Sequence, residues 1–355
     1  MKHHLLPLLL SLPLTAALVA QEQGAAAVPN PKTPAHEVLA TFVGTWRVET
    51  KTAAMPGVPG MEQASETTGT ERAELICNGL WLKVTGEGVC NGKDSQGIWL
   101  LGYDPVAKTY QCVAVSNLDS APCCMEASYD AATKTWDFHG DTPMGPFRSV
   151  FVQEGDRATE TCYAKGQDGK EQEFMRSVRT RVKAPLPTAT TVPASAKVGA
   201  DATLPAPLAA LHAGIGSWQA DFRMEMPGAP PMTSKCREVV AAVCDGKWLW
   251  SDFTGEMMGA PFEGHALTGY DEKIGKVVSI WIDSMNGALM RTDGSYDATT
   301  QTFALRGTCY DEQGKRVPVE STATSTKKDA RSFRMVFGTG EGAHVMTIDY
   351  RRAGK

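Results

Sequence analysis

Residues 128–140 read SYDAATKTWDFHG, and residues 295–307 read SYDATTQTFALRG. Seven of these thirteen positions are identical without a gap. The tetrapeptides LGYD, which ends at Asp104, and TGYD, which ends at Asp271, extend the match in the same register. FVGTW and GIGSW form a further pair, and all of these segments occur in the same order. An internal duplication of about 145 residues predicts two domains of one fold.

Short runs rich in β-branched and aromatic residues fill each repeat, with turn residues between them. Such runs are typical of β-strands, and their spacing favours a sandwich or an antiparallel barrel. A brief helical pattern, HEVLATFV in one repeat and APLAALHA in the other, comes before Gly-x-Trp. On the barrel alternative, we expect an all-β protein of two tandem antiparallel up-and-down barrels, each preceded by a short helix. The strands of the first repeat are expected to begin near Trp46, Glu71, Leu80, Ile98, Tyr110, Met125, Thr135, Phe147, Ala158 and Glu173.

The N-terminus has the layout of a signal peptide over residues 1–20. Lys2 precedes a short apolar run that Pro7 and Pro13 interrupt, and small Ala20 comes before a polar residue. No later stretch is apolar enough to span a bilayer, so we expect an exported protein, periplasmic or secreted, without a membrane span after cleavage. The net charge of -5 gives no basic footprint for a nucleic acid.

Composition also separates the domains. Residues 21–34 and 183–207 are rich in Pro and Ala and poor in large apolar residues. Such segments bury too little surface to offset the entropy of ordering, so they predict a disordered leader and a semi-extended linker. The first barrel domain is then expected at 35–182 and the second at 208–353.

The loops at the two ends of such a barrel differ. One end receives short polar turns, and among them ICNGLWL at 76–82 and VCDGKWL at 243–249 suggest two-residue Asn-Gly and Asp-Gly hairpin turns. We expect Cys77 and Cys244 to be structural parts of these hairpins.

The other end receives longer loops rich in Met, Pro and Gly, which favours an adaptable apolar rim around a barrel mouth. The same loops could instead plug the barrel or dock the two domains together. The candidate rim residues for ligand binding are Met226, Met232, Met257, Met258, Phe262 and Met285 in the second repeat and Met55, Met61, Met144 and Phe147 in the first.

A helix leading into Gly-x-Trp, a central Gly-Tyr-Asp and a closing Met-x-x-x-x-Arg strand (FMRSVRTRV, VMTIDYRRA) occur in both repeats. Each repeat resembles a bacterial family of exported domains of unknown function, DUF1579, with a lipocalin-like, or calycin, barrel. The second repeat is the better match, because QGIWLLGYD and AVSN in the first depart from PFEGHALTGYD and SIWID in the second.

The resemblance implies that the Gly-x-Trp tryptophan packs across the closed end of each barrel, under an arginine from the last strand. That pairs Trp46 with Arg179 or Arg181 in the first repeat. In the second repeat, it pairs Trp218 with Arg351 or Arg352. These residues would have a structural role, and the resemblance implies no known reaction.

The nine cysteines can form disulfides in an exported chain, and the odd number leaves at least one unpaired. Cys90 and the adjacent Cys123 and Cys124 fall on neighbouring loops at the expected mouth of the first barrel. We expect Cys90 to pair with Cys123 or Cys124, which would stiffen that mouth.

The sequence contains no pattern typical of a catalytic or metal site. It has no Gly-x-Ser-x-Gly, no Cys-x-x-Cys and no histidine pair with ligand spacing. A single-domain haem site with His265 as axial ligand stays open, as does Cu(I) binding by the thiols and thioethers at the first mouth. We expect no metal, no cofactor and no catalytic residue.

These observations favour a non-catalytic protein that holds a small apolar or amphipathic molecule in one or both barrels. The alternative is an interaction or structural protein with filled barrels, whose apolar loops contact a partner or the other domain. An enzyme is a third hypothesis, for which no acid, base and nucleophile occur together.

Overall fold

The computed structural model describes residues 31–55, 62–90, 92–142, 145–165, 169–183, 204–311, 313–327 and 329–354. The predicted signal peptide lies outside the described residues, as do most of the predicted leader and linker.

The first repeat begins with α1 (Pro34–Glu37) and a 3₁₀ turn, η1 (Val38–Phe42), and continues in ten antiparallel strands. Each strand pairs with its neighbours in the chain, and β1 also pairs with β10, which closes the barrel. The strands are β1 (Gly44–Thr52), β2 (Ser65–Ile76), β3 (Trp81–Cys90), β4 (Lys93–Asp104), β5 (Thr109–Ser116), β6 (Cys123–Asp130), β7 (Thr135–Thr142), β8 (Gly145–Glu154), β9 (Arg157–Lys165) and β10 (Glu171–Arg181).

The second repeat has the same topology after α2 (Ala206–His212), with β11 pairing both β12 and β20. The predicted fold class, two tandem up-and-down barrels each with a short preceding helix, is confirmed. The strands are β11 (Gly216–Glu225), β12 (Met232–Val243), β13 (Trp248–Met257), β14 (Ala260–Asp271), β15 (Lys276–Asp283), β16 (Met290–Asp297), β17 (Thr302–Tyr310), β18 (Arg316–Lys327), β19 (Ala330–Phe337) and β20 (His344–Arg352), and a 3₁₀ turn, η4 (Gly340–Gly342), precedes the last.

Most strands alternate between a buried and an exposed face. In β1, Trp46 and Val48 are buried while Arg47 and Glu49 are exposed. This period of two places one face of the sheet in the barrel core and the other in solvent. Closure of the barrel then removes the unpaired strand edges that would otherwise be open to aggregation.

The strands that join the two barrels are apolar on both faces. In β13, the first four residues, Trp248 to Ser251, are all buried. One continuous core contains outward side chains of β3, β4 and β5 together with those of β13, β14 and β15. Trp81 and Trp248, both fully buried in this core, lie directly over Gly102 and Gly269. A Cβ at Gly102 would come within 2.5 Å of the indole, so glycine is required for this packing.

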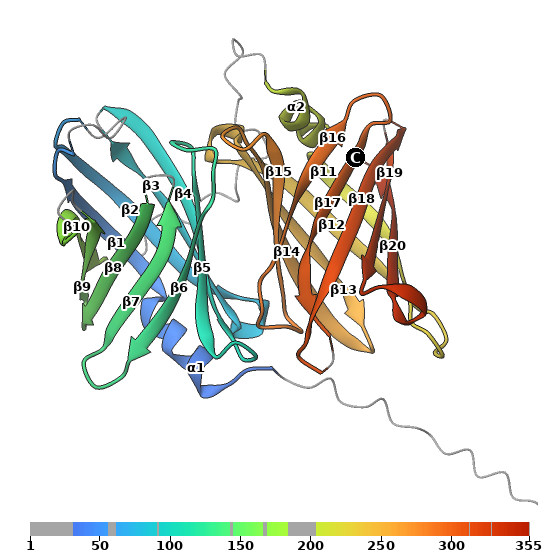
Figure 1. Cartoon of the computed structure of the whole chain (residues 1–355), viewed down its shortest axis with the longest axis horizontal. Coiled ribbons are helices and arrows are strands. Elements are labelled where there is room, and N and C mark those ends of the chain that lie inside the picture. Colours follow the sequence, from blue (N-terminus) through green and yellow to red (C-terminus); the bar gives the residue numbers. More distant parts are fainter. Residues whose placement is uncertain are drawn as a thin grey trace, which may run out of the picture.

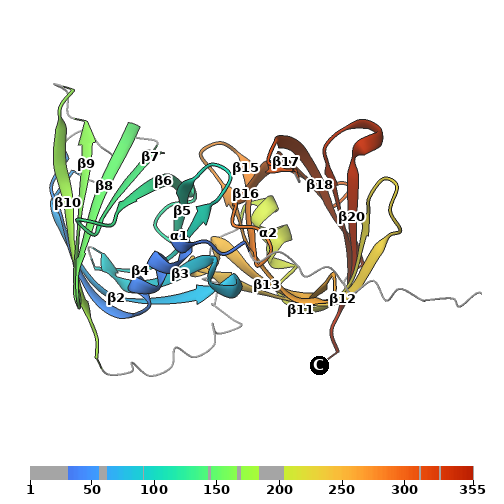
Figure 2. The ribbon, with the colours of Figure 1, turned by 90° about the horizontal axis from the view of Figure 1, so that it is seen from below.

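The barrels stand side by side with their helices at opposite ends (Figure 1). α1 lies at the lower end of the first barrel and α2 at the upper end of the second, and the view from below shows the same contact between β3–β5 and β13–β15 (Figure 2). The sequence left open that the methionine-rich loops dock the two domains together. In the structure, the core of the contact between the domains comes instead from the outer faces of strands.

The repeated Cys-Asn/Asp-Gly turn differs from the predicted two-residue hairpin. Ile76 pairs with Trp81, so the loop contains four residues. The 3₁₀ turns η2 (Cys77–Gly79) and η3 (Cys244–Gly246) form these loops, and φ is 52° at Cys77 as well as positive at the following Asn and Gly. The prediction was wrong because the cysteine also adopts a left-handed conformation and widens the turn.

Candidate functional site: two barrel cavities

Each barrel encloses a cavity of ligand size. The first measures about 440 Å³ and the second about 470 Å³, within the range of small-molecule sites. The surface of both linings is mostly apolar, and each cavity reaches a charged cluster near the helix-capped end. The barrels are therefore hollow, which removes the filled barrel that the alternative hypothesis requires.

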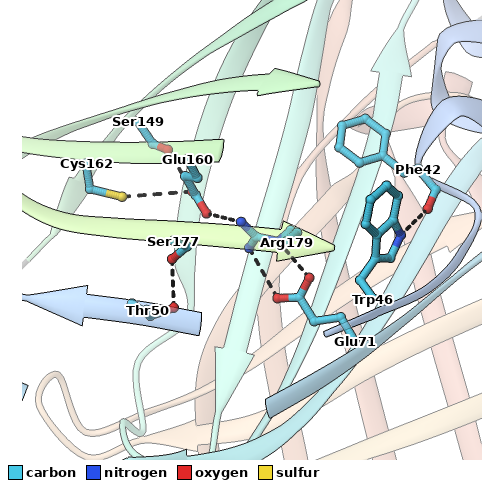
Figure 3. Close-up of polar contacts among 9 residues, drawn as sticks. All are labelled: Phe42, Trp46, Thr50, Glu71, Ser149, Glu160, Cys162, Ser177 and Arg179. Carbon is cyan, nitrogen blue, oxygen red and sulfur yellow. Dashed lines mark hydrogen bonds and ion pairs between the residues drawn. The ribbon is translucent and has the colours of Figure 1, made fainter. Parts of the chain in front are cut away.

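The charged cluster of the first cavity is built around Arg179 of β10 (Figure 3). Its Nε and Nη2 donate to the two carboxylate oxygens of Glu71 at 2.8 and 3.2 Å, and its Nη1 donates to Glu160 at 2.9 Å. The side chain of Arg179 is only 15% exposed. Burial opposes the charge of Arg179, but the two carboxylates raise its pKa above the ordinary value and keep it protonated.

Hydroxyl groups complete this cluster. Ser149 donates to Oε1 of Glu160 at 2.7 Å, and the Cys162 thiol lies 3.9 Å from the same oxygen. Thr50 and Ser177 share a hydrogen bond of 2.8 Å nearby (Figure 3). With two carboxylates and one guanidinium, the cluster carries an excess of one negative charge.

The second cavity keeps the glutamate and moves the arginine. Glu238, which occupies the position of Glu71 in its repeat, accepts hydrogen bonds from Ser251 and from Arg331 of β19. In the first barrel the arginine is on β10, facing Ala158 of β9; in the second, Arg331 on β19 faces Tyr350 of β20. The guanidinium thus comes from the last strand in the first barrel and from the strand before it in the second. With one carboxylate and one guanidinium, the second cluster is neutral.

Each cavity also has one tryptophan on β4 and β5 or on their equivalents. Trp99 pairs with Ala114 in the first barrel, whereas Ala266 pairs with Trp281 in the second. All four residues line their cavities. The exchange moves the indole to the neighbouring strand, so the two cavities have similar volumes but different shapes.

The closed ends have the tryptophan and arginine contacts that the resemblance implies. In each barrel, one of the two candidate arginines makes this contact. The guanidinium of Arg181 lies 4.1 Å from the ring of Trp46, and that of Arg352 lies 4.3 Å from Trp218. Arg179 instead points into the cavity, as described above. Arg351 binds Asp221 at 2.9 Å on the outer surface.

Both clamping arginines are held by the turn that precedes their barrel. Arg181 donates to the backbone carbonyls of Thr41 and Val43, and Arg352 donates to those of Ala213 and Ile215. A cation over an indole contributes about 0.5–2 kcal/mol. These contacts fix the helix against the first strand and close one end of each cavity.

The candidate rim residues separate into three groups. Met232, Met257, Phe262, Met285 and Phe147 line the cavities. Met226, Met258 and Met55 are described but do not belong to either lining, and Met258 is 49% exposed. Met61 and Met144 lie outside the described residues. Of the five lining residues, Met257 is buried in the core of its barrel.

All nine cysteines are free thiols. The expected pairing of Cys90 with Cys123 or Cys124 is therefore not formed in this structure. Cys123 lines the first cavity, while the thiol of Cys124 lies 3.3 Å from Arg291 of the second barrel. Burial raises the pKa of Cys123 to about 11, which keeps this thiol protonated at neutral pH.

The charged clusters are the part of the site that sequence reasoning missed. The sequence did indicate the glutamates, because Glu71 in β2 and Glu238 in β12 occupy equivalent positions in the two repeats. Their inward direction follows from the alternation with exposed neighbours. The arginine partners gave no such signal, since they come from different strands in the two repeats.

Among the described residues, no helix combines the length and the apolar character of a membrane span.

Comparison with known proteins identifies the family of this chain. A search of curated proteins finds no match. An S-type phycobiliprotein lyase from Guillardia theta has a TM-score of 0.32 and 13% identity, covering 43% of this chain and 95% of the other.

Two further solved structures match nearly the whole chain at lower scores. A protein of unknown function of the DUF3598 family from Nostoc punctiforme has a TM-score of 0.24 and 10% identity, with coverage of 91% and 100%. A putative outer membrane protein from Bacteroides fragilis has a TM-score of 0.20 and 10% identity, with coverage of 89% and 99%. Similarities this low identify no shared activity. The family described as "Protein of unknown function (DUF1579)" matches residues 31–181 and again residues 206–352, so the chain belongs to the DUF1579 family and carries two copies of its domain.

Proposed function

We propose that the two barrels bind small amphipathic or apolar molecules without catalysing a reaction on them. The observation that carries this proposal is a closed barrel with a ligand-sized, mostly apolar cavity and one buried charged cluster, present twice in the chain. Such a combination of an apolar lining and a few placed polar groups is typical of ligand pockets.

The first barrel is proposed to prefer a ligand with a cationic or hydrogen-bond-donating end. Its cluster of Glu71, Glu160 and Arg179 carries an excess negative charge at the inner end of the cavity. All three guanidinium nitrogens already bind carboxylate oxygens. An anionic head group would therefore meet net repulsion, because three of the five N–H groups of Arg179 already bind carboxylate oxygens.

The second barrel is proposed to take a more apolar ligand. Its cavity is lined by Phe253, Phe262 and Trp281 and by seven methionines, Met224, Met232, Met257, Met285, Met290, Met335 and Met346. Methionine is flexible and polarisable, so such a lining adapts to ligands of several shapes. The pair of Glu238 and Arg331 is neutral, and burial raises the pKa of Asp283, the other acidic side chain of this lining, which disfavours its charged form.

Binding of decylamine, decanol and decanoate to the full-length protein tests this assignment, because the three probes share one chain length. We expect two molecules of decanol per chain in native mass spectrometry, and at least tenfold weaker binding of decanoate than of decylamine to the first barrel. Ala114→Trp and Ala266→Trp place a second indole in the first and second cavity, and each should lower the stoichiometry of decanol from two to one.

Ile274→Trp is the matched control, since it adds an indole at a turn residue that is 53% exposed. It should leave both sites intact. Stoichiometry that stays at two in both cavity variants would place binding outside the barrels and refute the proposal. Loss of both sites in a single variant, with an unchanged circular dichroism spectrum, would contradict the independence of the two cavities.

Export is part of this proposal. Residues 1–20 have the layout of a signal peptide, and cleavage after Ala20 would release a chain that begins at Gln21. Intact mass measurement on protein from a periplasmic or culture-medium fraction should give a mature chain that starts at Gln21. An unprocessed N-terminus, or protein found only in the cytoplasm, would contradict export.

A further inference from the structure

A cluster of metal-ligating side chains lies between the barrels, away from both cavities. The donor atoms of Cys77, Glu263 and His265 lie within 4.8 Å of one another. Cys77 belongs to the turn before β3 of the first barrel, while Glu263 and His265 lie on β14 of the second. Cys77 is fully buried and His265 is 5% exposed, so the cluster lies within the contact that joins the barrels.

Each ligand candidate is oriented by a second hydrogen bond. Nδ1 of His265 lies 2.9 Å from Oδ1 of Asp252, and Nε2 lies 2.9 Å from Oε1 of Glu263. The backbone N–H of Cys77 donates to the other oxygen of Glu263 at 3.0 Å. A histidine fixed by a carboxylate at one nitrogen and directed toward further ligands with the other is the common arrangement around a protein-bound metal.

The ring of His265 is also held by packing. It stacks on the indole of Trp250 with 4.9 Å between ring centroids, and Nζ of Lys83 lies 3.9 Å from the centroid of that indole. Lys83 comes from the first barrel, so residues of both barrels surround the cluster. The imidazole cannot turn away from Glu263 without losing the hydrogen bond to Asp252 and the stacking contact.

The two repeats differ at this cluster in an informative way. Cys77 has an equivalent in Cys244, but Gln96 and Ile98 stand at the positions of Glu263 and His265. Gln96 keeps the docking role, since its Oε1 accepts a hydrogen bond from the backbone of Asp245 at 3.2 Å. Docking of the turn therefore needs only an oxygen acceptor, and it explains neither the carboxylate nor the histidine.

We propose that Cys77, Glu263 and His265 form a zinc site that joins the two barrels. Thiolate, imidazole and carboxylate are the three donor types that Zn²⁺ takes, at about 2.0–2.3 Å. Nε2 of His265 and Oε1 of Glu263 are 2.9 Å apart, so the ion would bind by replacing the hydrogen bond between them. Three protein ligands leave a fourth position for water, on the side of Glu263, whose side chain is 36% exposed.

The charges of the cluster fit a divalent cation. Zn²⁺ would displace the thiol proton and the Nε2 proton into solvent, since a coordinated thiol is deprotonated. The thiolate and the Glu263 carboxylate would then balance its charge.

Zinc and cobalt binding to the full-length, chelator-treated protein test the site. We expect about one Zn²⁺ per chain by elemental analysis after dialysis, a higher melting temperature with Zn²⁺, and a thiolate-to-cobalt charge-transfer band when Co²⁺ is added. Cys77→Ser should abolish the charge-transfer band and weaken zinc binding about 100-fold.

The repeat itself supplies the other variants. Glu263→Gln and His265→Ile introduce the residues that the first repeat carries at these positions, so both should fold, and each should weaken zinc binding about 100-fold. Cys244→Ser, at the equivalent thiol for which Gln96 and Ile98 stand in place of Glu263 and His265, should leave zinc affinity and the cobalt band unchanged. Absence of saturable zinc binding, or equal effects of Cys77→Ser and Cys244→Ser, would show instead that His265 and its two carboxylates form an ion-pair cluster complete without metal.

Discussion

Arg179→Met is expected to destabilise the protein by about 3–5 kcal/mol, because removal of one partner leaves buried charges without compensation. Glu71 and Glu160 both bind this guanidinium, and their side chains are only 10% and 20% exposed. Methionine retains an unbranched apolar stem but supplies no donor. Urea denaturation at neutral pH, followed by circular dichroism, measures the loss.

Arg176→Met is the matched control on the same strand. Arg176 forms two hydrogen bonds of 2.8 Å with Glu173, but its side chain is 54% exposed. Solvent screens such a pair, so its loss should have little measurable effect. The triple variant Arg179→Met, Glu71→Gln, Glu160→Gln should recover most of the stability, since no buried charge then remains. A large loss that the triple variant does not recover would assign the effect to packing instead of charge.

Trp248→Ala should cost about 3–5 kcal/mol, as expected for truncation of a fully buried tryptophan. This side chain is 0% exposed and lies in the core shared by the two barrels. A cavity there weakens the contact between the domains as well as the strand that carries the residue. We therefore expect one unfolding transition for the native chain in calorimetry and two separate transitions for the variant, most clearly in the double variant with Trp81→Ala.

Trp99→Ala provides the comparison, because this indole already borders the first cavity. It has fewer atoms packed against it, and its removal should cost less than half as much. Trp81→Ala should match Trp248→Ala, since the two indoles occupy equivalent positions in one core. Equal costs for Trp248→Ala and Trp99→Ala, with one transition retained in the double variant, would argue against a stabilising inter-barrel core.

Much of the fold could be predicted because its signals are local. The expected strand starts at Trp46, Ile98, Tyr110 and Thr135 lie within or beside observed strands. Period-two alternation and turn residues depend only on neighbours in the chain. The four-residue loop at Cys77 was missed because Asn-Gly signals a left-handed turn without fixing how many residues adopt it.

The candidate site was predicted less well, because its members meet only across strands. The methionine-rich loops predicted an apolar rim around the barrel mouth, and of these candidates Met232, Met257 and Met285 line a cavity. Glu71 and Arg179 are 108 residues apart in the chain, and no local pattern relates them. Opposite charges can pair across any strands that closure of the barrel brings together.

The sequence by itself determined the duplication and the all-β class, since these follow from repetition, alternation and short connections, whereas the choice of a barrel over a sandwich rested on the family resemblance. Only the tertiary structure decided that β3–β5 and β13–β15 meet and that Cys77 reaches Glu263, 186 residues further along the chain. Alternation shows which face of a strand is apolar, and WLW at 248–250 shows that both faces are. It cannot show which surface covers the outer face, because that depends on the complementary shape and charge of a second folded barrel.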